Sequence, residues 1–375
     1  MAIWNKRKKT DDLSQQEAVA PPEEPELAAP PKEIGALQAE LEAFLYPTPP
    51  QPTPCELKDQ SLTPSGLYPY EILILDRAST LYTDQEEFPA FWRRDYGILQ
   101  MPKILASLVE RGFLTEAGMD TTLTAATVST LKQALRTSGK PVGGKKAELI
   151  ARLLNTVPEG ELYTLFPRRT FIRTPAGNRA LDEAIHISYL HKRPVEGLTI
   201  WSLHREVMEH PEQSYRDLVW AHLEARSKAL LQAKDYAAYR ACRYRMYQFQ
   251  MEENKLKRAF PLLSEVMYYD LSGIEGGTGT LQRYVSEQHF FPYDHSIVRL
   301  SAVCVQAMKK LQVDLGLSEE MLRALFMQFF SQFKLPFHLF TVEECAVIVL
   351  LELRGDTERL RKAYELAQAR FNQRN

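Results

Sequence analysis

The chain has 375 residues and a formal net charge of −2 at pH 7. Hydrophobic residues make up 45% and charged residues 25% of it, as in an ordinary globular protein and unlike a disordered or fibrous chain. This near-neutral balance excludes a protein that coats nucleic acid through its overall charge, so any contact with DNA must come from a local basic patch.

Cysteine and histidine spacing gives no sign of a disulfide framework, a metal site or a bound cofactor. The four cysteines lie far apart without a CxxC pair, and the eight histidines include no HExxH motif. The charged N-terminus is not followed by an apolar segment, and no stretch approaches the roughly 18 apolar residues that span a bilayer. We expect a cytoplasmic protein with reduced thiols, no metal, no cofactor and no membrane contact.

Residues 1–65 are predicted to form a disordered, proline-rich tail and linker. Proline clusters at 21–31 and 47–54 have a composition that cannot bury enough apolar surface to offset chain entropy. Between them, apolar residues recur at helical spacing over 34–45 and predict one short amphipathic helix. This helix either docks on the protein's own core or binds a partner.

Residues 66–190 are predicted to form one compact region of helices and two short strands. Its expected elements, in chain order, are a helix from Tyr70, a helix at 102–111, a strand at 112–115, a strand at 169–174 and a helix that carries Leu181 and Ile185. The two strands lie on either side of a segment, 124–156, with a pattern of its own.

Residues 124–156 predict two short helices that pack on each other across a loop. Thr127 or Thr124 can cap the first helix, whose apolar face holds Val128, Leu131, Ala134 and Leu135. Gly139 ends this helix and Pro141 prevents its continuation. The second helix begins near Lys145 and buries Ala147, Leu149, Ile150 and Leu153.

This segment is basic although the whole chain is slightly acidic. Its cations are opposed only by Glu148, and they are Lys132, Arg136, Lys140, Lys145, Lys146 and Arg152. Gly143 and Gly144 precede the second helix and allow backbone N–H groups to approach an anion near its N-terminus, a geometry that favours phosphate. These eight residues are the predicted DNA-binding site.

The segment resembles the SAP motif. Val128, Leu131, Lys132 and Leu135 follow the first-helix pattern V-x-x-L-K-x-x-L, and residues 144–153 read G-K-K-A-E-L-I-A-R-L, as in the second helix of the family. The resemblance implies binding of double-stranded DNA, often A/T-rich, with Lys145 and Lys146 on phosphates and Lys132 and Arg152 beside them. Lys140 departs from the family, which usually has leucine there. The alternative is a helical hairpin for protein contacts.

The flanking elements resemble a winged-helix domain in layout, as in bacterial SAP-containing proteins of unassigned function. The helix at 102–111 would be the recognition helix, and the two strands would form a wing into which the SAP-like unit is inserted. Phe113 and Leu114 would then pair with Phe171 and Ile172, and Arg168, Arg169 and Arg173 would add positive charge. An alternative is that the hairpin only anchors the inserted unit.

Residues 195–375 are predicted to be all-helical, as in a tetratricopeptide-like or solenoid-like stack. Expected helices cover 199–210, 213–233, 235–254, 257–270, 296–315, 318–334, 341–353 and 356–372. In the third of these, Arg240, Arg243, Tyr244 and Tyr247 form a face that could meet a nucleic-acid backbone or an acidic peptide. A stacked-helix interior explains the aromatic residues without such a function and is the favoured interpretation.

The sequence thus predicts a non-enzymatic, cytoplasmic DNA-binding protein of bacterial or phage-associated type, nucleoid-associated if bacterial. The helical C-terminal region would bind an unknown protein partner or build an oligomer. One rival interpretation is an adaptor or scaffold in which the SAP-like hairpin and the helical repeats both bind proteins. Another is an enzyme with scattered active residues, which a buried cluster of carboxylates or histidines would support.

Overall fold

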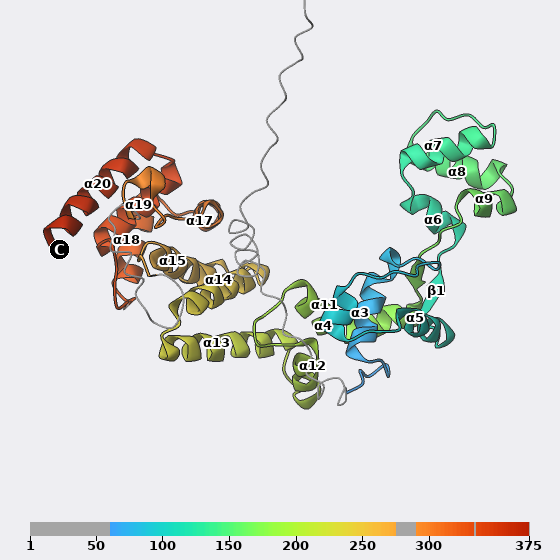
Figure 1. Ribbon diagram of the computed structural model, residues 1–375, viewed down its shortest axis with the longest axis horizontal. Helices are drawn as coiled ribbons and strands as arrows, with labels where there is room; N and C mark the ends of the chain where they lie inside the picture. Colours follow the sequence, from blue (N-terminus) through green and yellow to red (C-terminus); the bar gives the residue numbers. More distant parts are fainter. Residues whose placement is uncertain (1–60, 275–289, 334, 375) are drawn as a thin grey trace, which may run out of the picture. The chain divides into compact units, whose positions relative to one another are not determined.

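A computed structural model describes residues 61–274, 290–333 and 335–374. These residues are mainly helical, as the sequence predicts (Figure 1). The helix expected at 34–45 and most of the tail and linker expected at 1–65 lie outside the described residues. Among the helices that are described, none is long and apolar enough to cross a membrane.

The first part of the fold surrounds a buried helix, α3 (Pro69–Arg77), in which Ile72 to Leu75 are completely buried. Around it lie η1 (Ala78–Thr80), α4 (Phe91–Tyr96), α5 (Met101–Glu110), α10 (Pro175–Glu183), α11 (Ile185–Lys192) and α12 (Ile200–Glu209). Helix α3 contacts α5, α10, α11 and α12, which explains why all four of its central side chains are excluded from water. The single helix expected to carry Leu181 and Ile185 is two helices, because α10 ends before Ile185.

The two predicted strands pair, although both are shorter than expected. Strand β1 (Leu114–Glu116) runs antiparallel to β2 (Phe171–Arg173), with Leu114 opposite Arg173 and Thr115 opposite Ile172. The predicted pairing of Phe113 and Leu114 with Phe171 and Ile172 is therefore wrong in register. Helix α10 crosses close to the hairpin, since a Cβ on Gly177 would lie 2.2 Å from the carbonyl oxygen of Phe113.

Between the two strands the chain forms four helices with a hydrophobic cluster of their own (Figure 1). They are α6 (Met119–Ala125), α7 (Val128–Thr137), α8 (Lys146–Thr156) and α9 (Glu159–Leu165). The buried residues of this cluster run from Met119 to Phe166 and are distinct from the larger core that the rest of the described chain builds. The chain enters the four-helix unit from β1 and leaves it into β2.

The helices predicted in the C-terminal region are present, one of them with a later start. They are α12, whose bounds are given above, and α13 (Tyr215–Ala233), α14 (Tyr236–Glu252), α15 (Leu256–Asp270), α17 (Ala302–Leu315), α18 (Glu319–Phe330), α19 (Val342–Arg354) and α20 (Thr357–Arg374), with η2 (Tyr293–His295) before α17. The helix expected at 296–315 begins only at Ala302, where the hydroxyl of Ser301 accepts a hydrogen bond from the N–H of Cys304. Residues 296–300 alternate between buried and exposed, as in an extended segment.

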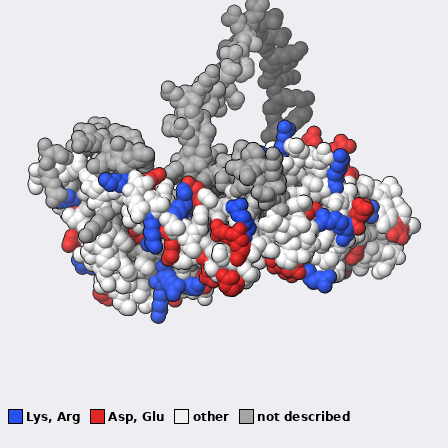
Figure 2. Space-filling model, turned by 90° about the horizontal axis from the view of Figure 1, so that it is seen from below, with Lys and Arg blue, Asp and Glu red and all other residues white. Residues whose placement is uncertain are grey.

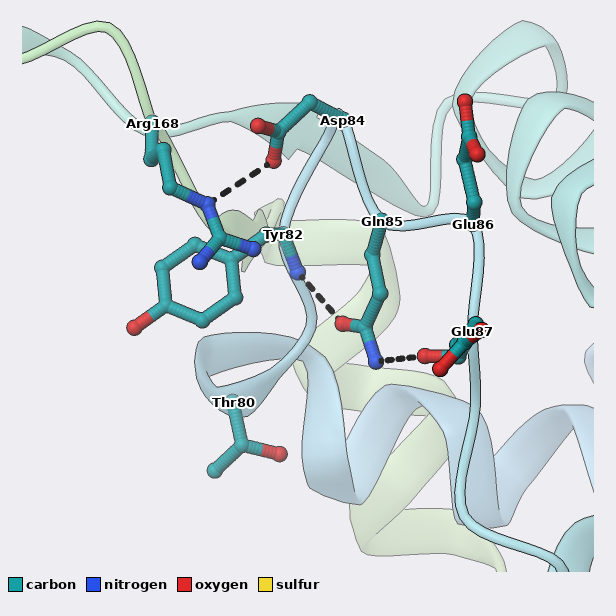
Figure 3. Close-up of a pocket in the computed structure, with 7 residues that line it drawn as sticks. All are labelled: Thr80, Tyr82, Asp84, Gln85, Glu86, Glu87 and Arg168. Carbon is teal, nitrogen blue, oxygen red and sulfur yellow. Dashed lines mark hydrogen bonds and ion pairs between the residues drawn. The ribbon is translucent and has the colours of Figure 1, made fainter.

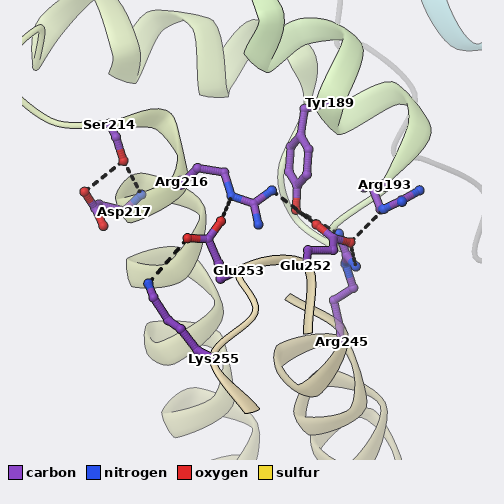
Figure 4. A network of polar contacts seen from close by, with 9 residues as sticks. All are labelled: Tyr189, Arg193, Ser214, Arg216, Asp217, Arg245, Glu252, Glu253 and Lys255. Atoms are coloured by element: carbon purple, nitrogen blue, oxygen red, sulfur yellow. Dashed lines mark hydrogen bonds and ion pairs between the residues drawn. The ribbon is translucent and has the colours of Figure 1, made fainter. Parts of the chain in front are cut away.

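A polar network joins α11, α13 and α14 (Figure 4). The carboxylate of Glu252 accepts hydrogen bonds from Tyr189 Oη at 3.0 Å and Arg193 Nε at 2.7 Å. It also accepts from Arg216 Nη1 at 3.2 Å and Arg245 Nη1 at 3.3 Å. Burial raises the pKa of Glu252, but the Arg245 charge and the bonds from Tyr189 and Arg216 outweigh it, so the pKa is lowered and the carboxylate stays ionised.

Candidate nucleic-acid interface

Helix α7 begins and ends where its sequence predicts. The hydroxyl of Thr127 accepts a hydrogen bond from the N–H of Thr130 at 3.1 Å and caps the N-terminus. At the other end Gly139 adopts a φ of +64°, and the N–H of Lys140 donates to the carbonyl of Leu135 at 2.7 Å. This is the Schellman arrangement, in which a left-handed glycine turns the chain out of the helix.

The core between α7 and α8 is smaller than predicted. Its buried members on these two helices are Leu131, Ala134, Leu135, Leu149 and Leu153, with Ile150 partly buried against them. The prediction that Val128 and Ala147 belong to it is wrong, because 41% of Val128 is exposed and Ala147 is exposed as well. Both residues lie in the first turn of their helices, beyond the edge of so small a core.

Two helices that the sequence reasoning missed complete this core. Met119 and Leu123 of α6, and Leu162 of α9 with the following Phe166, are buried in the same cluster. Each pair is spaced by four residues, which places both members on one helix face, and this spacing is the signal that could have predicted the two helices. The unit therefore extends beyond the predicted limits 124–156 on both sides.

The loop from Lys140 to Gly144 is held by Arg152. The guanidinium Nη1 of Arg152 donates to the carbonyl oxygens of Pro141 at 2.6 Å and Gly143 at 2.9 Å. Arg152 lies in α8, nine to eleven residues further along the chain, so the two bonds tie the loop to the helix that follows it. The sequence predicts Arg152 as a DNA contact, and its pattern does not reveal these bonds to the loop.

The N-terminus of α8 is occupied by a carboxylate of its own. Glu148 Oε2 accepts a hydrogen bond from the backbone N–H of Lys145 at 3.3 Å. The positive end of the helix dipole stabilises the carboxylate at this position. The preceding Gly144 has a φ of +119°, and a Cβ there would lie 2.4 Å from Glu148 Oε2. Gly144 is therefore required for this turn, whereas a Cβ on Gly143 would meet nothing within 4 Å.

The predicted cations fall into two groups. Lys146 Nζ donates to the carbonyl of Thr124 at the end of α6 at 2.6 Å, so Lys146, like Arg152, makes a contact inside the unit. In the described parts of the chain no hydrogen bond or ion pair engages the other four side chains, which are those of Lys132, Arg136, Lys140 and Lys145. Arg136 and Lys145 are exposed, and Lys132 and Lys140 are half-buried.

Residues 122–157 match the family model of the SAP domain. This segment is a SAP domain. The match covers the end of α6, α7, the loop and α8, and it confirms the resemblance seen in the sequence. No curated protein and no solved structure matches the chain. Because SAP domains are generally DNA-binding modules, the match supports a nucleic-acid-binding role for this chain.

The arginines in and just before β2 are bound to other residues of the chain. Arg168 Nε pairs with Asp84 at 3.2 Å, and Arg169 pairs with Glu116. Arg173 donates to the side chain of Asn178 at 2.8 Å and to a backbone carbonyl of α3 at 2.9 Å. The positive charge that these residues were predicted to add is therefore largely neutralised or used within the fold.

A shallow polar pocket of about 430 Å³ lies beside the β1–β2 hairpin (Figure 3). Its lining residues are Thr80, Tyr82, Asp84, Gln85, Glu86, Glu87 and Arg168. The guanidinium of Arg168 stacks on the ring of Tyr82, 4.1 Å from its centroid, and three carboxylates outnumber this one cation. Such a surface repels phosphate, so the pocket does not extend the basic surface of the SAP domain.

Charges elsewhere on the surface are mixed. On the face drawn in Figure 2, Lys and Arg residues lie among Asp and Glu residues, in keeping with the net charge of −2.

The arginines of α14 that could have met a nucleic acid or an acidic peptide are engaged within the fold. Arg240 makes two 2.8 Å bonds to Asp270, and Arg243 Nε lies 2.6 Å from Glu265, both carboxylates belonging to α15. These arginines tie α14 to α15.

Other titratable groups lie in the helical core. Among the described residues no group of three or more His, Cys, Asp or Glu side chains could hold a metal ion. Cys242, Cys304 and Cys345 are buried free thiols, and burial raises the pKa of each. His186 Nε2 and His204 Nδ1 lie 3.0 Å apart, and burial lowers the pKa of His186 to about 3, so this ring is neutral at pH 7.

Proposed function

We propose that this chain is a non-enzymatic, cytoplasmic DNA-binding protein whose SAP domain contacts the backbone of double-stranded DNA. The match of residues 122–157 to the SAP family carries the proposal. It is supported by four cations that no described residue engages and by the exposed Gly143–Gly144 segment that precedes α8. Lysine and arginine on phosphate supply affinity and position, and little information about base sequence.

The number of available cations sets the expected strength and salt dependence of binding. Four phosphate contacts give a slope of log K against log salt of about −3.6. Between 50 and 200 mM salt, affinity should then fall roughly a hundredfold. Base preference would come from groove shape, and a narrow A/T-rich minor groove concentrates negative potential near such cations.

We propose that the β1–β2 hairpin and α10 support the SAP domain structurally. Paired β1 and β2, preceded by α5 and followed by α10, support the winged-helix-like layout of residues 66–190. Because its arginines bind Asp84, Glu116 and Asn178, we propose that the hairpin carries the SAP domain without touching DNA.

A second candidate function is that of an adaptor. Exposed apolar side chains in the C-terminal helices favour protein contacts there, with Val303 64%, Val313 78% and Met321 51% exposed. We propose that this region binds a protein partner, whose identity is unknown, or a second copy of the chain. In the adaptor interpretation the SAP domain also binds protein, and DNA binding is absent.

Fluorescence anisotropy with A/T-rich and G/C-rich duplexes, measured on the full chain at rising salt, tests the proposal. The double variant Lys140→Glu/Lys145→Glu, which changes two of the four available cations, should lose binding. The matched control Lys309→Glu/Lys310→Glu changes the net charge equally on α17 and should bind like the natural chain. Equal losses in both doubles would place the contact outside the SAP domain. If the natural chain does not bind even at low salt, the adaptor function remains.

A further inference from the structure

Arg152 has a different part in DNA binding from the other cations of the SAP domain. We infer that Arg152 is a positioning residue, which fixes the loop 140–144 against α8 and does not itself contact phosphate. This inference rests on the proposed function of the SAP domain. It departs from the family resemblance, which places Arg152 beside the phosphate-binding lysines.

The loop has few other constraints. Proline lacks an N–H, and within the described chain the backbone N–H groups of residues 142–144 donate to no backbone carbonyl. Val142 packs partly against the small core. The two bonds from Arg152 Nη1 to the carbonyls of Pro141 and Gly143 are thus the main polar contacts that hold the loop.

The position of the loop determines how two lysine side chains and several backbone N–H groups can approach an anion. Lys140 begins the loop and Lys145 directly follows it, and neither side chain has a partner among the described residues. Between them, N–H groups without an intramolecular acceptor can donate to phosphate oxygens, as in other glycine-rich anion sites. By drawing two loop carbonyls toward its own charge, Arg152 keeps these acceptors from facing the same anion.

The chemistry at Arg152 suits guanidinium better than ammonium. The side chain must reach from α8 to two carbonyls separated by one residue, and it is half-buried. Both bonds leave one nitrogen, Nη1, whose two N–H directions are fixed by the planar, weakly hydrated guanidinium, whereas the ammonium of lysine rotates freely and is more strongly hydrated. A phosphate contact at an exposed position, in contrast, can be made by lysine, which binds phosphate as a point charge.

Four variants of the full chain distinguish a loop-positioning role of Arg152 from a direct phosphate contact. Arg152→Lys and Arg152→Met should both weaken binding of the A/T-rich duplex at least tenfold at 50 mM salt. The matched pair uses Arg136, an exposed arginine on α7 without a partner in the described residues. Arg136→Lys should bind within twofold of the natural chain, and Arg136→Met should lose about 0.9 from the salt slope.

The salt dependence of binding distinguishes loss of the loop position from loss of one charge. Arg152→Lys keeps the charge, yet its slope should fall by more than one phosphate contact, because Lys140 and Lys145 are no longer held together. If Arg152→Lys binds with the affinity and slope of the natural chain, Arg152 is a phosphate contact and the inference is wrong.

The amide resonances of Gly143 and Gly144 keep the inference separate from the proposed function. In a two-dimensional NMR spectrum without DNA, Arg152→Lys should shift or broaden these two signals while the signals of Leu131 and Leu135 report an intact core. Arg136→Lys should leave them in place. If the natural chain fails to bind DNA but these shifts occur, the proposed function is wrong and the loop-positioning role stands. Unchanged glycine signals in Arg152→Lys overturn the positioning role whether or not DNA binds.

Discussion

Replacing Gly144 by alanine should open the SAP domain, whereas the same change at Gly143 should not. Gly144 has a φ of +119°, a region that costs a residue with a Cβ about 1–3 kcal/mol. The new Cβ would also lie 2.4 Å from Glu148 Oε2, so the carboxylate must move and release the N–H of Lys145, at a cost of about 1 kcal/mol. The sum for Gly144→Ala is roughly 2–4 kcal/mol.

Gly143→Ala is a matched control from the adjacent residue. Its Cβ meets nothing within 4 Å and its φ is not in the left-handed region, so alanine should change stability by less than about 1 kcal/mol, in the stabilising direction. Hydrogen exchange of α7 and α8 amides in the full chain measures the difference, which should reach about a hundredfold in the opening equilibrium. Equal exchange in the two variants would refute the structural reasoning, because neither substitution changes the charge.

Three further predictions concern single carboxyl and imidazole groups. Glu148→Gln should tighten DNA binding roughly fivefold at low salt, since it removes the one negative charge at the helix N-terminus, and unchanged affinity in anisotropy would contradict this. Glu265→Gln should cost roughly 3 kcal/mol in urea unfolding because it leaves its arginine partner on α14 half-buried without a counter-ion, whereas Asp294→Asn, which breaks an exposed ion pair, should leave the unfolding midpoint nearly unchanged. Burial holds the pKa of His186 near 3 against about 6.5 in the unfolded chain, so the unfolded state takes up a proton first and stability should fall by about 2 kcal/mol between pH 6.5 and 5; His186→Phe should flatten that loss, and an unaltered pH dependence would count against it.

Local signals in the sequence predicted the helices of the SAP domain well. Caps and apolar spacing act within one or two turns, which is why Thr127 and Gly139 mark the limits of α7 correctly. The errors at Val128 and Ala147 have a shared cause, since helical periodicity tells which face is apolar but not how far the core extends along it. Helices α6 and α9 were missed for another reason, because each contributes only one four-residue apolar pair to the core, a weaker signal than the longer patterns of α7 and α8.

Side-chain partners from distant segments could not be predicted. The pairs of Arg168 with Asp84 and of Arg240 with Asp270 join residues 84 and 30 positions apart, and only the packed fold brings them together. Arg152 illustrates the same point within one domain. Its long side chain could reach solvent or the loop with equal ease, and the sequence pattern does not distinguish these outcomes. Residue type predicted the positive charge and left the function of each cation open.

This division among the cations explains how a slightly acidic chain can still have a DNA-binding surface. At 0.1 M ionic strength a charge is felt over about 10 Å, so a phosphate near the SAP loop senses Lys140 and Lys145 and not the net charge of the chain. Two of the six basic residues of the domain fix that surface from inside, and because their partners are neutral carbonyls they keep their positive charge. A surface of this kind depends on loop geometry as much as on charge, and for that reason charge-neutral changes at Gly144 and Arg152 are the sharpest tests of it.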